Sequence, residues 1–136
     1  TPAPRLWFEV NSDLLAIAST ASAKAELKRC DTDNLCLPTE PSFHFGGSGV
    51  SGSVFMDNAD YRNYLHETFD AQVIEMETAA IAMVAYSNDV PFIAFRSVSD
   101  LAGGGTATQN EIRAFEHLAA RNSAALVIAF MEHFPK

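Results

Sequence analysis

Two carboxylates, Glu75 and Glu77, bracket Met76 at a point where an apolar strand is expected to pass into a helix. Side chains at positions i and i+2 of an extended segment point to opposite sides. One carboxylate is therefore expected to face a ligand, while the other is structural or pairs with Arg96. A carboxylate that accepts two hydrogen bonds suits adjacent hydroxyl groups of a sugar. Both acids also fit a purely structural role, because the helix dipole favours negative charge at a helix N-terminus.

A third acid, Asp100, follows the apolar segment 91–98 together with Ser99. A carboxyl group at the end of a strand can hold a proton when burial disfavours its charged form. Asp100 is therefore a candidate general acid, a role that Asp and Glu often fill. The alternative is an ordinary turn or helix-capping aspartate, which suits the same position equally well.

Glycine and serine dominate residues 46–53, and Phe55 comes just after this stretch. Glycines at the end of a strand allow positive φ angles and a close approach of the backbone to a ligand. The face of Phe55 would suit stacking on a flat heteroaromatic ring. The stretch is neither a Walker loop nor a dinucleotide fingerprint, since the lysine and the glycine spacing are missing. The structural alternatives are a flexible turn or a bulged strand for the glycine stretch, and one more core phenylalanine for Phe55.

The elements that must position these residues alternate between helix and strand. Helices are predicted at about 12–28, 59–69, 77–87 and 109–133, strands at 43–45, 73–76 and 91–99, and loops at 29–41 and 46–53. This order predicts an α/β layered domain with a mostly parallel sheet. Ligands of such sheets bind at the carboxyl ends of the strands, which is where all three candidate segments are expected.

Composition places the chain among globular proteins and narrows its partners. Its 136 residues are 48% apolar and 19% charged, with a formal net charge of −8. The acidic balance disfavours nucleic acid as a partner, because phosphate backbones are bound by clustered Lys and Arg. No apolar run reaches the ~18 residues that a membrane-spanning helix needs. The four histidines share no metal-ligand spacing, so neither a metal nor a cofactor is predicted.

Cys30 and Cys36 lie close together in a polar loop. They are either two reduced thiols or one short disulfide, and their closeness in a segment without other core signals favours the disulfide. A disulfide would place the protein in an oxidising compartment, since cytosolic proteins rarely keep one. The first residues show no signal-peptide pattern, and the chain is expected to be a mature or cleaved product.

Three segments of the chain resemble the superfamily of purine nucleoside phosphorylases and methylthioadenosine nucleosidases. They are Ser51–Met56, Val73–Ala80 and Phe95–Asp100. The pairing of Met-Glu with a downstream Ser-Asp, in this order, is specific. The cysteine-containing loop, Gly46-Gly47 and Asp57–Arg62 are similar to the plant bark or vegetative storage protein branch. Ser53 stands where the nucleosidase pattern has Asp, a departure from that branch.

The resemblance implies a role for each residue of a purine nucleoside site. Substrate contacts would come from Phe55, Met56, Glu75, Met76, Glu77, Arg96 and Ser99. Among these, Phe55 would stack on the purine and Glu77 would bind the ribose hydroxyls. Asp100 would be the catalytic residue, donating a proton to the five-membered ring of the purine as the glycosidic bond breaks.

The resemblance covers the C-terminal portion of the family's three-layer fold, a twisted, mostly parallel sheet flanked by helices. Residues 1–136 are therefore expected to be that portion of one domain, acting with an N-terminal fragment and assembling as a homo-oligomer. The function implied is cleavage of a purine nucleoside, with phosphate or water as the acceptor. The alternative is a catalytically inactive plant storage or purine-binding protein. The storage-protein likeness also implies the secretory pathway, with a vacuolar or extracellular location.

Overall fold

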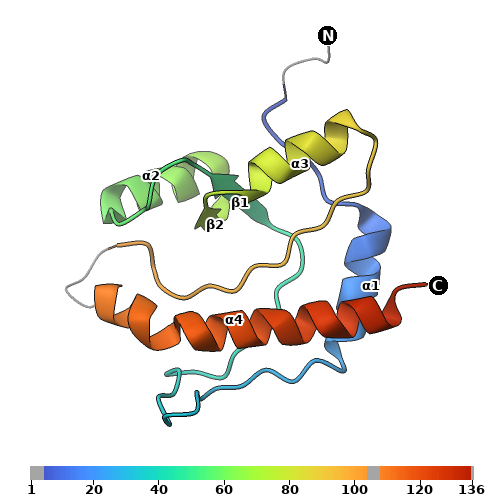
Figure 1. Ribbon diagram of the computed structural model, residues 1–136. Coiled ribbons are helices and arrows are strands. Elements are labelled where there is room, and N and C mark those ends of the chain that lie inside the picture. Colours follow the sequence, from blue (N-terminus) through green and yellow to red (C-terminus); the bar gives the residue numbers. More distant parts are fainter. Residues whose placement is uncertain (1–4, 104–107, 136) are drawn as a thin grey trace.

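The computed structural model describes residues 5–103 and 108–135 of the chain. The elements are, in order, α1 (Ser12–Ser22), β1 (Ser48–Ser51), α2 (Ala59–Phe69), β2 (Ala71–Glu75), α3 (Thr78–Ser87) and α4 (Thr108–His133). Helices packed around parallel strands confirm the predicted α/β class. Figure 1 shows β1 and β2 between α2 and α3, with the long helix α4 on the other side of the molecule.

The sheet of the described residues is the parallel pair β1-β2, joined through α2. Strand β1 lies inside the Gly/Ser stretch, so the prediction of a strand at 43–45 followed by a loop at 46–53 is wrong. The alternative of a bulged strand agrees with the structure, since the register of β1 shifts between Ser48 and Gly49. Glycine and serine rarely favour strands, but backbone hydrogen bonds to β2 decide the conformation here. The register places Ser51 opposite Glu75, at the carboxyl ends of the two strands.

Helices α2 and α3 lie close to where the sequence predicts them, and local residues account for their ends. The side chain of Asn58 accepts a hydrogen bond of 2.9 Å from the Tyr61 N–H and caps the start of α2. Asp70 ends α2 in the left-handed region, with a φ of 50°. Asn88 follows the last residue of α3 as its C-cap.

Helix α1 packs against α4 and forms a small apolar core. Its buried side chains are Ala18, Ala21, Ala129 and Phe130, and those packed against them are Leu14, Ile17, Ala25, Ile93 and Phe95. Alanines on one face of α1 allow the two helices to approach closely. This core supports the extended segment that follows α3, because Ile93 and Phe95 belong to it.

The prediction that the first helix continues to residue 28 is wrong, because α1 ends at Ser22. The buried side chain of Asn122 in α4 holds the backbone of Lys28 on both sides. Its Oδ1 accepts a hydrogen bond of 2.8 Å from the Lys28 N–H, and its Nδ2 donates one of 2.9 Å to the Lys28 carbonyl. A helix that included Lys28 would use that N–H for its own hydrogen bond.

Residues 91–99 are extended but pair with no strand among the described residues, so the prediction of a strand there is wrong. A strand exists only where a neighbouring strand accepts and donates its hydrogen bonds. The segment instead packs on α4, where the rings of Phe95 and Phe130 meet edge to face with centroids 5.1 Å apart. Figure 1 shows it running back alongside α4 from the end of α3. The segment contains Arg96, and Asp100 follows directly after it.

The disulfide predicted between Cys30 and Cys36 is confirmed, since their sulfur atoms are bonded. Hydrogen bonds close the same loop independently. The Asp31 carboxylate accepts from the N–H groups of Asp33 at 2.9 Å and Leu35 at 2.8 Å. The bridge therefore reinforces a turn that polar contacts already define.

Replacing both Cys30 and Cys36 by serine is expected to lower the free energy of unfolding by no more than about 2 kcal/mol. The bridge closes a short loop, with a sequence separation of 6, so it removes little entropy from the unfolded chain. Urea denaturation of the wild type and the double variant measures the difference. Rapid alkylation of both thiols without a reductant would show that no bridge forms.

Candidate functional site

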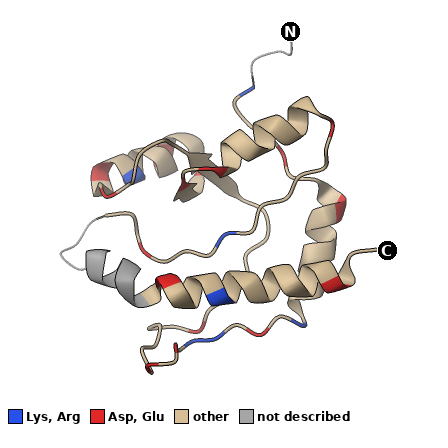
Figure 2. Ribbon diagram, in the orientation of Figure 1, with Lys and Arg blue, Asp and Glu red and all other residues tan. Residues whose placement is uncertain are grey.

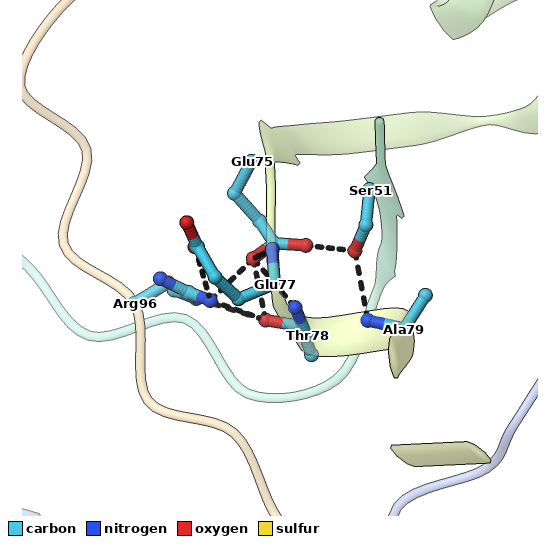
Figure 3. A network of polar contacts seen from close by, with 6 residues as sticks. All are labelled: Ser51, Glu75, Glu77, Thr78, Ala79 and Arg96. Carbon is cyan, nitrogen blue, oxygen red and sulfur yellow. Dashed lines mark hydrogen bonds and ion pairs between the residues drawn. The ribbon is translucent and has the colours of Figure 1, made fainter. Parts of the chain in front are cut away.

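The carboxyl ends of β1 and β2 hold a hydrogen-bonded network centred on Glu75 (Figure 3). Ser51 faces Glu75 across the parallel pair, and its hydroxyl group donates to Oε1 of Glu75. The same hydroxyl oxygen accepts a hydrogen bond of 2.8 Å from the N–H of Ala79 in α3. Two strand ends and the first turn of a helix are thus tied together.

The side chain of Glu75, three residues before Thr78, accepts hydrogen bonds from the first N–H groups of α3. Its Oε2 accepts hydrogen bonds from the N–H groups of Glu77 at 2.9 Å and Thr78 at 2.8 Å, and from the Thr78 hydroxyl at 2.8 Å. A helix start has unpaired N–H groups and a positive dipole end, so a carboxylate there is stabilising. Glu77 occupies the N-cap position, yet its side chain makes no capping hydrogen bond. Glu75 is therefore the structural carboxylate of the two.

Arg96 reaches the network from the extended segment 91–99 (Figure 3). Its Nη2 pairs with Oε2 of Glu75 and lies 3.4 Å from Oε2 of Glu77. Its Nε and Nη2 also donate to the Thr78 hydroxyl oxygen, at 2.9 Å and 2.6 Å. One guanidinium group between two carboxylates offsets their mutual repulsion. The structure thus contains the predicted pairing of an acid with Arg96.

The pKa of Glu75 reflects two opposing effects. Burial raises it, but the hydrogen bonds from Ser51, from the N–H groups of Glu77 and Thr78 and from the Thr78 hydroxyl outweigh burial and lower the pKa to about 2. Glu75 is therefore ionised at neutral pH and carries no proton to a reaction. A carboxylate offers about four lone-pair sites, and these donors together with Arg96 occupy most of them. Four of these five donors meet Oε2 and only Ser51 meets Oε1, so little acceptor capacity is left for a ligand.

Glu77 and Met76 have the opposite character. The side chain of Glu77 is 62% exposed and contacts Arg96, and Met76 is 45% exposed. Both follow the carboxyl end of β2, the position at which parallel sheets bind ligands. Apart from its contact with Arg96, Glu77 is thus the carboxylate whose acceptor sites remain open.

Asp100 and Ser99 form a second group with its own hydrogen bonds. The Ser99 hydroxyl donates to Oδ2 of Asp100 at 2.7 Å, and the N–H of Ala102 donates to Oδ1 at 2.7 Å. The half-buried carboxyl group is thereby held in one orientation. Ser99 lines an open depression of about 280 Å³ between the extended segment and α4, with Glu116 and Ser123 on the helical side.

Phe55 and Met56 follow β1 without joining either group. Phe55 is 66% exposed, and Met56 is half-buried. Within the described part of the chain, no hydrogen bond or ring contact connects them with Glu77 or Asp100. The structure brings Glu75, Glu77 and Arg96 together and leaves the Phe55 ring open to solvent.

Ser51 and Thr78 belong to the network although the sequence pattern nominated neither. A carboxylate three residues before a threonine at a helix start has the spacing of an N-terminal capping contact, so Thr78 had a local signal. Ser51 had none, because its contact with Glu75 depends on the register of two strands.

Charged residues are dispersed over the described elements. Figure 2 shows basic residues singly on α2, on the extended segment and on α4, with acidic residues on most elements. Across residues 5–103 and 108–135, no three His, Cys, Asp or Glu side chains are grouped so as to hold a metal ion. Likewise, no helix in these ranges has the length and apolar character to cross a membrane.

Comparisons with known proteins match nearly the whole chain to one family. The model of the "Phosphorylase superfamily" matches residues 3–132. Bark storage protein B of Populus deltoides is 27% identical over 134 residues, which are 98% of this chain and 41% of that protein. A 5'-methylthioadenosine/S-adenosylhomocysteine nucleosidase of Listeria monocytogenes serotype 4b is 40% identical over 88 residues, 63% of this chain and 36% of that protein.

A solved structure shares the fold. The futalosine hydrolase of Helicobacter pylori strain 26695 superposes with a TM-score of 0.75 at 23% identity. The superposition covers 98% of this chain and 50% of that one. The chain therefore spans half or less of the length of the relatives it matches.

Proposed function

Because this chain belongs to the phosphorylase superfamily, we propose that it supplies the purine- and ribose-binding part of a site that cleaves the N-glycosidic bond of purine nucleosides. The observation that carries the proposal is the division of roles between the two carboxylates after β2. Hydrogen bonds within the protein occupy Glu75, whereas Glu77 stands exposed beside it. A carboxylate with open acceptor sites at a helix start suits two adjacent ribose hydroxyls.

In this proposal Asp100 gives its proton to the five-membered ring of the purine as the bond between C1′ and the base breaks. The base then leaves as a neutral molecule rather than an anion, and such acid catalysis typically contributes ~10² to 10⁴-fold in rate. The sugar becomes cation-like, and Glu77 on its hydroxyls stabilises it. An oxygen of water or phosphate completes the reaction at C1′. Phe55 stacks on the base, Met56 contacts its edge, and Met76 lies against the sugar.

We also expect a further part of the same fold to pack against this chain. The chain spans 41% of bark storage protein B and 50% of the futalosine hydrolase chain. Helix α3 exposes four large hydrophobic side chains, Ile81, Met83, Val84 and Tyr86. An exposed apolar face marks a contact surface. We propose that an N-terminal portion of the same fold covers this face and supplies the group that activates water or phosphate. "Complete protein" below means this chain together with that portion.

A storage or purine-binding protein without turnover is the second candidate. Bark storage protein B matches 98% of this chain, whereas the Listeria nucleosidase matches 63%. The disulfide between Cys30 and Cys36 also suits a protein of the secretory pathway, such as a vacuolar or extracellular one. In this case the nucleoside contacts persist while catalysis is absent.

Release of free base from adenosine, inosine and methylthioadenosine separates the two candidates. We expect the complete protein to release base, and a requirement for phosphate would identify phosphorolysis. We expect no release from the 136-residue chain alone. Nucleoside binding by the complete protein without any base release would favour the storage candidate. Catalysis by the 136-residue chain alone would contradict the need for an N-terminal portion.

Replacing Glu77 by alanine is expected to weaken adenosine binding by about tenfold to hundredfold, because charge-assisted hydrogen bonds to the ribose are lost. Binding of free adenine should change little, since it has no ribose. Calorimetry on the complete protein measures both affinities. Glu67→Ala, which removes an exposed carboxylate from α2, is the matched control. Equal losses for adenosine and adenine would place Glu77 outside the sugar site.

A further inference from the structure

Arg62 in α2 holds the turn that follows Asp100. Its Nη1 donates hydrogen bonds to the carbonyl oxygens of Leu101 at 2.8 Å and Gly103 at 2.5 Å. These two carbonyls flank Ala102, whose N–H donates to Oδ1 of Asp100. One side chain of α2 is thus connected, through a single turn, to the carboxyl group of Asp100.

The same turn lies tightly against the residues that precede α2. Gly103 has a φ of +97°, and a Cβ at this position would lie 2.4 Å from the backbone nitrogen of Asn58. Ala102, with a φ of 54°, also lies in the left-handed region. A non-glycine residue in that region persists only where its surroundings hold it. Arg62 and the backbone of Asn58 provide those surroundings.

We propose that Arg62 is the positioning residue for Asp100 and sets the orientation in which its carboxyl group meets the purine. The inference rests on the proposed function, in which Asp100 is the acid. Asn58 follows Phe55 and Met56 closely in the chain, so the contact with the turn also places the acid relative to the base-stacking segment. The planar guanidinium of arginine can serve two carbonyls at once, and it stays charged at any working pH.

The kinetic test compares Arg62→Met and Arg62→Lys in the complete protein. Arg62→Met is expected to lower kcat for the best purine nucleoside by roughly tenfold to hundredfold with little change in KM, because a displaced acid transfers its proton poorly. Arg62→Lys still donates to a carbonyl and is expected to retain more of the rate. Arg121→Met, which alters an exposed arginine of α4, is the control and should leave kcat unchanged.

The N7-methyl derivative of the same nucleoside distinguishes positioning of the acid from general damage. Its five-membered ring already carries a positive charge, so its base leaves without being protonated. The loss caused by Arg62→Met is expected to disappear largely with this substrate. Equal losses with both substrates would overturn the inference, because Arg62 would then act on folding or binding.

Amide hydrogen exchange over residues 99–103 tests the contact without requiring turnover. Removing the Arg62 hydrogen bonds is expected to speed exchange at Ala102 by about tenfold or more, with no change in Arg121→Met. If the complete protein releases no base, the proposed function fails, and faster exchange still shows that Arg62 holds the turn. Unchanged exchange in Arg62→Met overturns the inference even in an active enzyme.

Discussion

Replacing Asp100 by asparagine is expected to lower the turnover of a purine nucleoside by about 10²-fold or more, while the affinity for that nucleoside changes little. Asparagine has the size of aspartate, and its one side-chain oxygen can accept the hydrogen bond from the Ala102 N–H while its NH₂ group donates to the Ser99 hydroxyl oxygen. It cannot deliver a proton to the departing base. Steady-state kcat and the equilibrium affinity of the complete protein are the two measurements.

The matched control for this variant is Asp13→Asn, which changes an exposed aspartate in the first turn of α1. It should leave turnover at the wild-type level. Full activity of Asp100→Asn would show that another group protonates the base, and the family membership would be unaffected by that result.

The second large effect is expected on stability. Replacing Glu75 by glutamine should lower the free energy of unfolding at neutral pH. The amide has one oxygen and one NH₂ group, so some of the donors around Glu75 would face another donor and lose their acceptor. The difference between the ordinary pKa of 4.5 and about 2 corresponds to at most about 3 kcal/mol, and solvent screening reduces this to about 2 kcal/mol. Urea denaturation of the complete protein measures it. Glu77→Ala, at the same helix start but exposed, should cost far less.

The stabilisation by Glu75 is expected to depend on pH in one direction. Because folding lowers the pKa of Glu75, its contribution is complete above the ordinary value of 4.5 and is lost as the pH falls toward about 2. The difference in unfolding free energy between wild type and Glu75→Gln should therefore shrink over that window. A difference that stays constant down to pH 2 would show that the ionised form of Glu75 has no special stabilising role.

The sequence correctly predicted those helices whose ends depend on capping residues next to them in the chain. Helix α2 begins after Asn58, whose side chain caps it, and α3 ends beside Asn88. The errors occurred where distant residues decide. Strand β1 forms in a Gly/Ser stretch because β2 lies beside it. At the predicted end of the first helix, Asn122, 94 residues away in the sequence, takes the backbone hydrogen bonds of Lys28 instead.

In the candidate site, too, most contacts between residues far apart in the sequence were not predicted. The prediction that one of the two acids after β2 is structural and pairs with Arg96 is confirmed for Glu75. The expectation that Glu75 and Glu77 point to opposite sides is wrong, since both carboxylates contact the same guanidinium group of Arg96 and Glu77 leaves the extended conformation at the helix start. That Glu77 faces a ligand stays a prediction.

The contacts of Ser51 with Glu75 and of Arg62 with the turn after Asp100 join residues 24 and at least 39 positions apart. No periodicity in one sequence reveals such pairs, since they depend on strand register and on helix placement. All predicted catalytic and substrate-binding roles stay predictions, those of Asp100 and Glu77 included.

The Ser51–Glu75 contact also bears on the order of events when the chain refolds. It closes over 24 residues, whereas Asn122 meets Lys28 only across 94. Bringing together distant residues costs more chain entropy and slows folding. We therefore expect the β1–α2–β2 unit to form before α1 meets α4. During that interval the apolar faces of α1 and α4 are still separate, and collisions between partly folded chains compete with productive folding at high protein concentration.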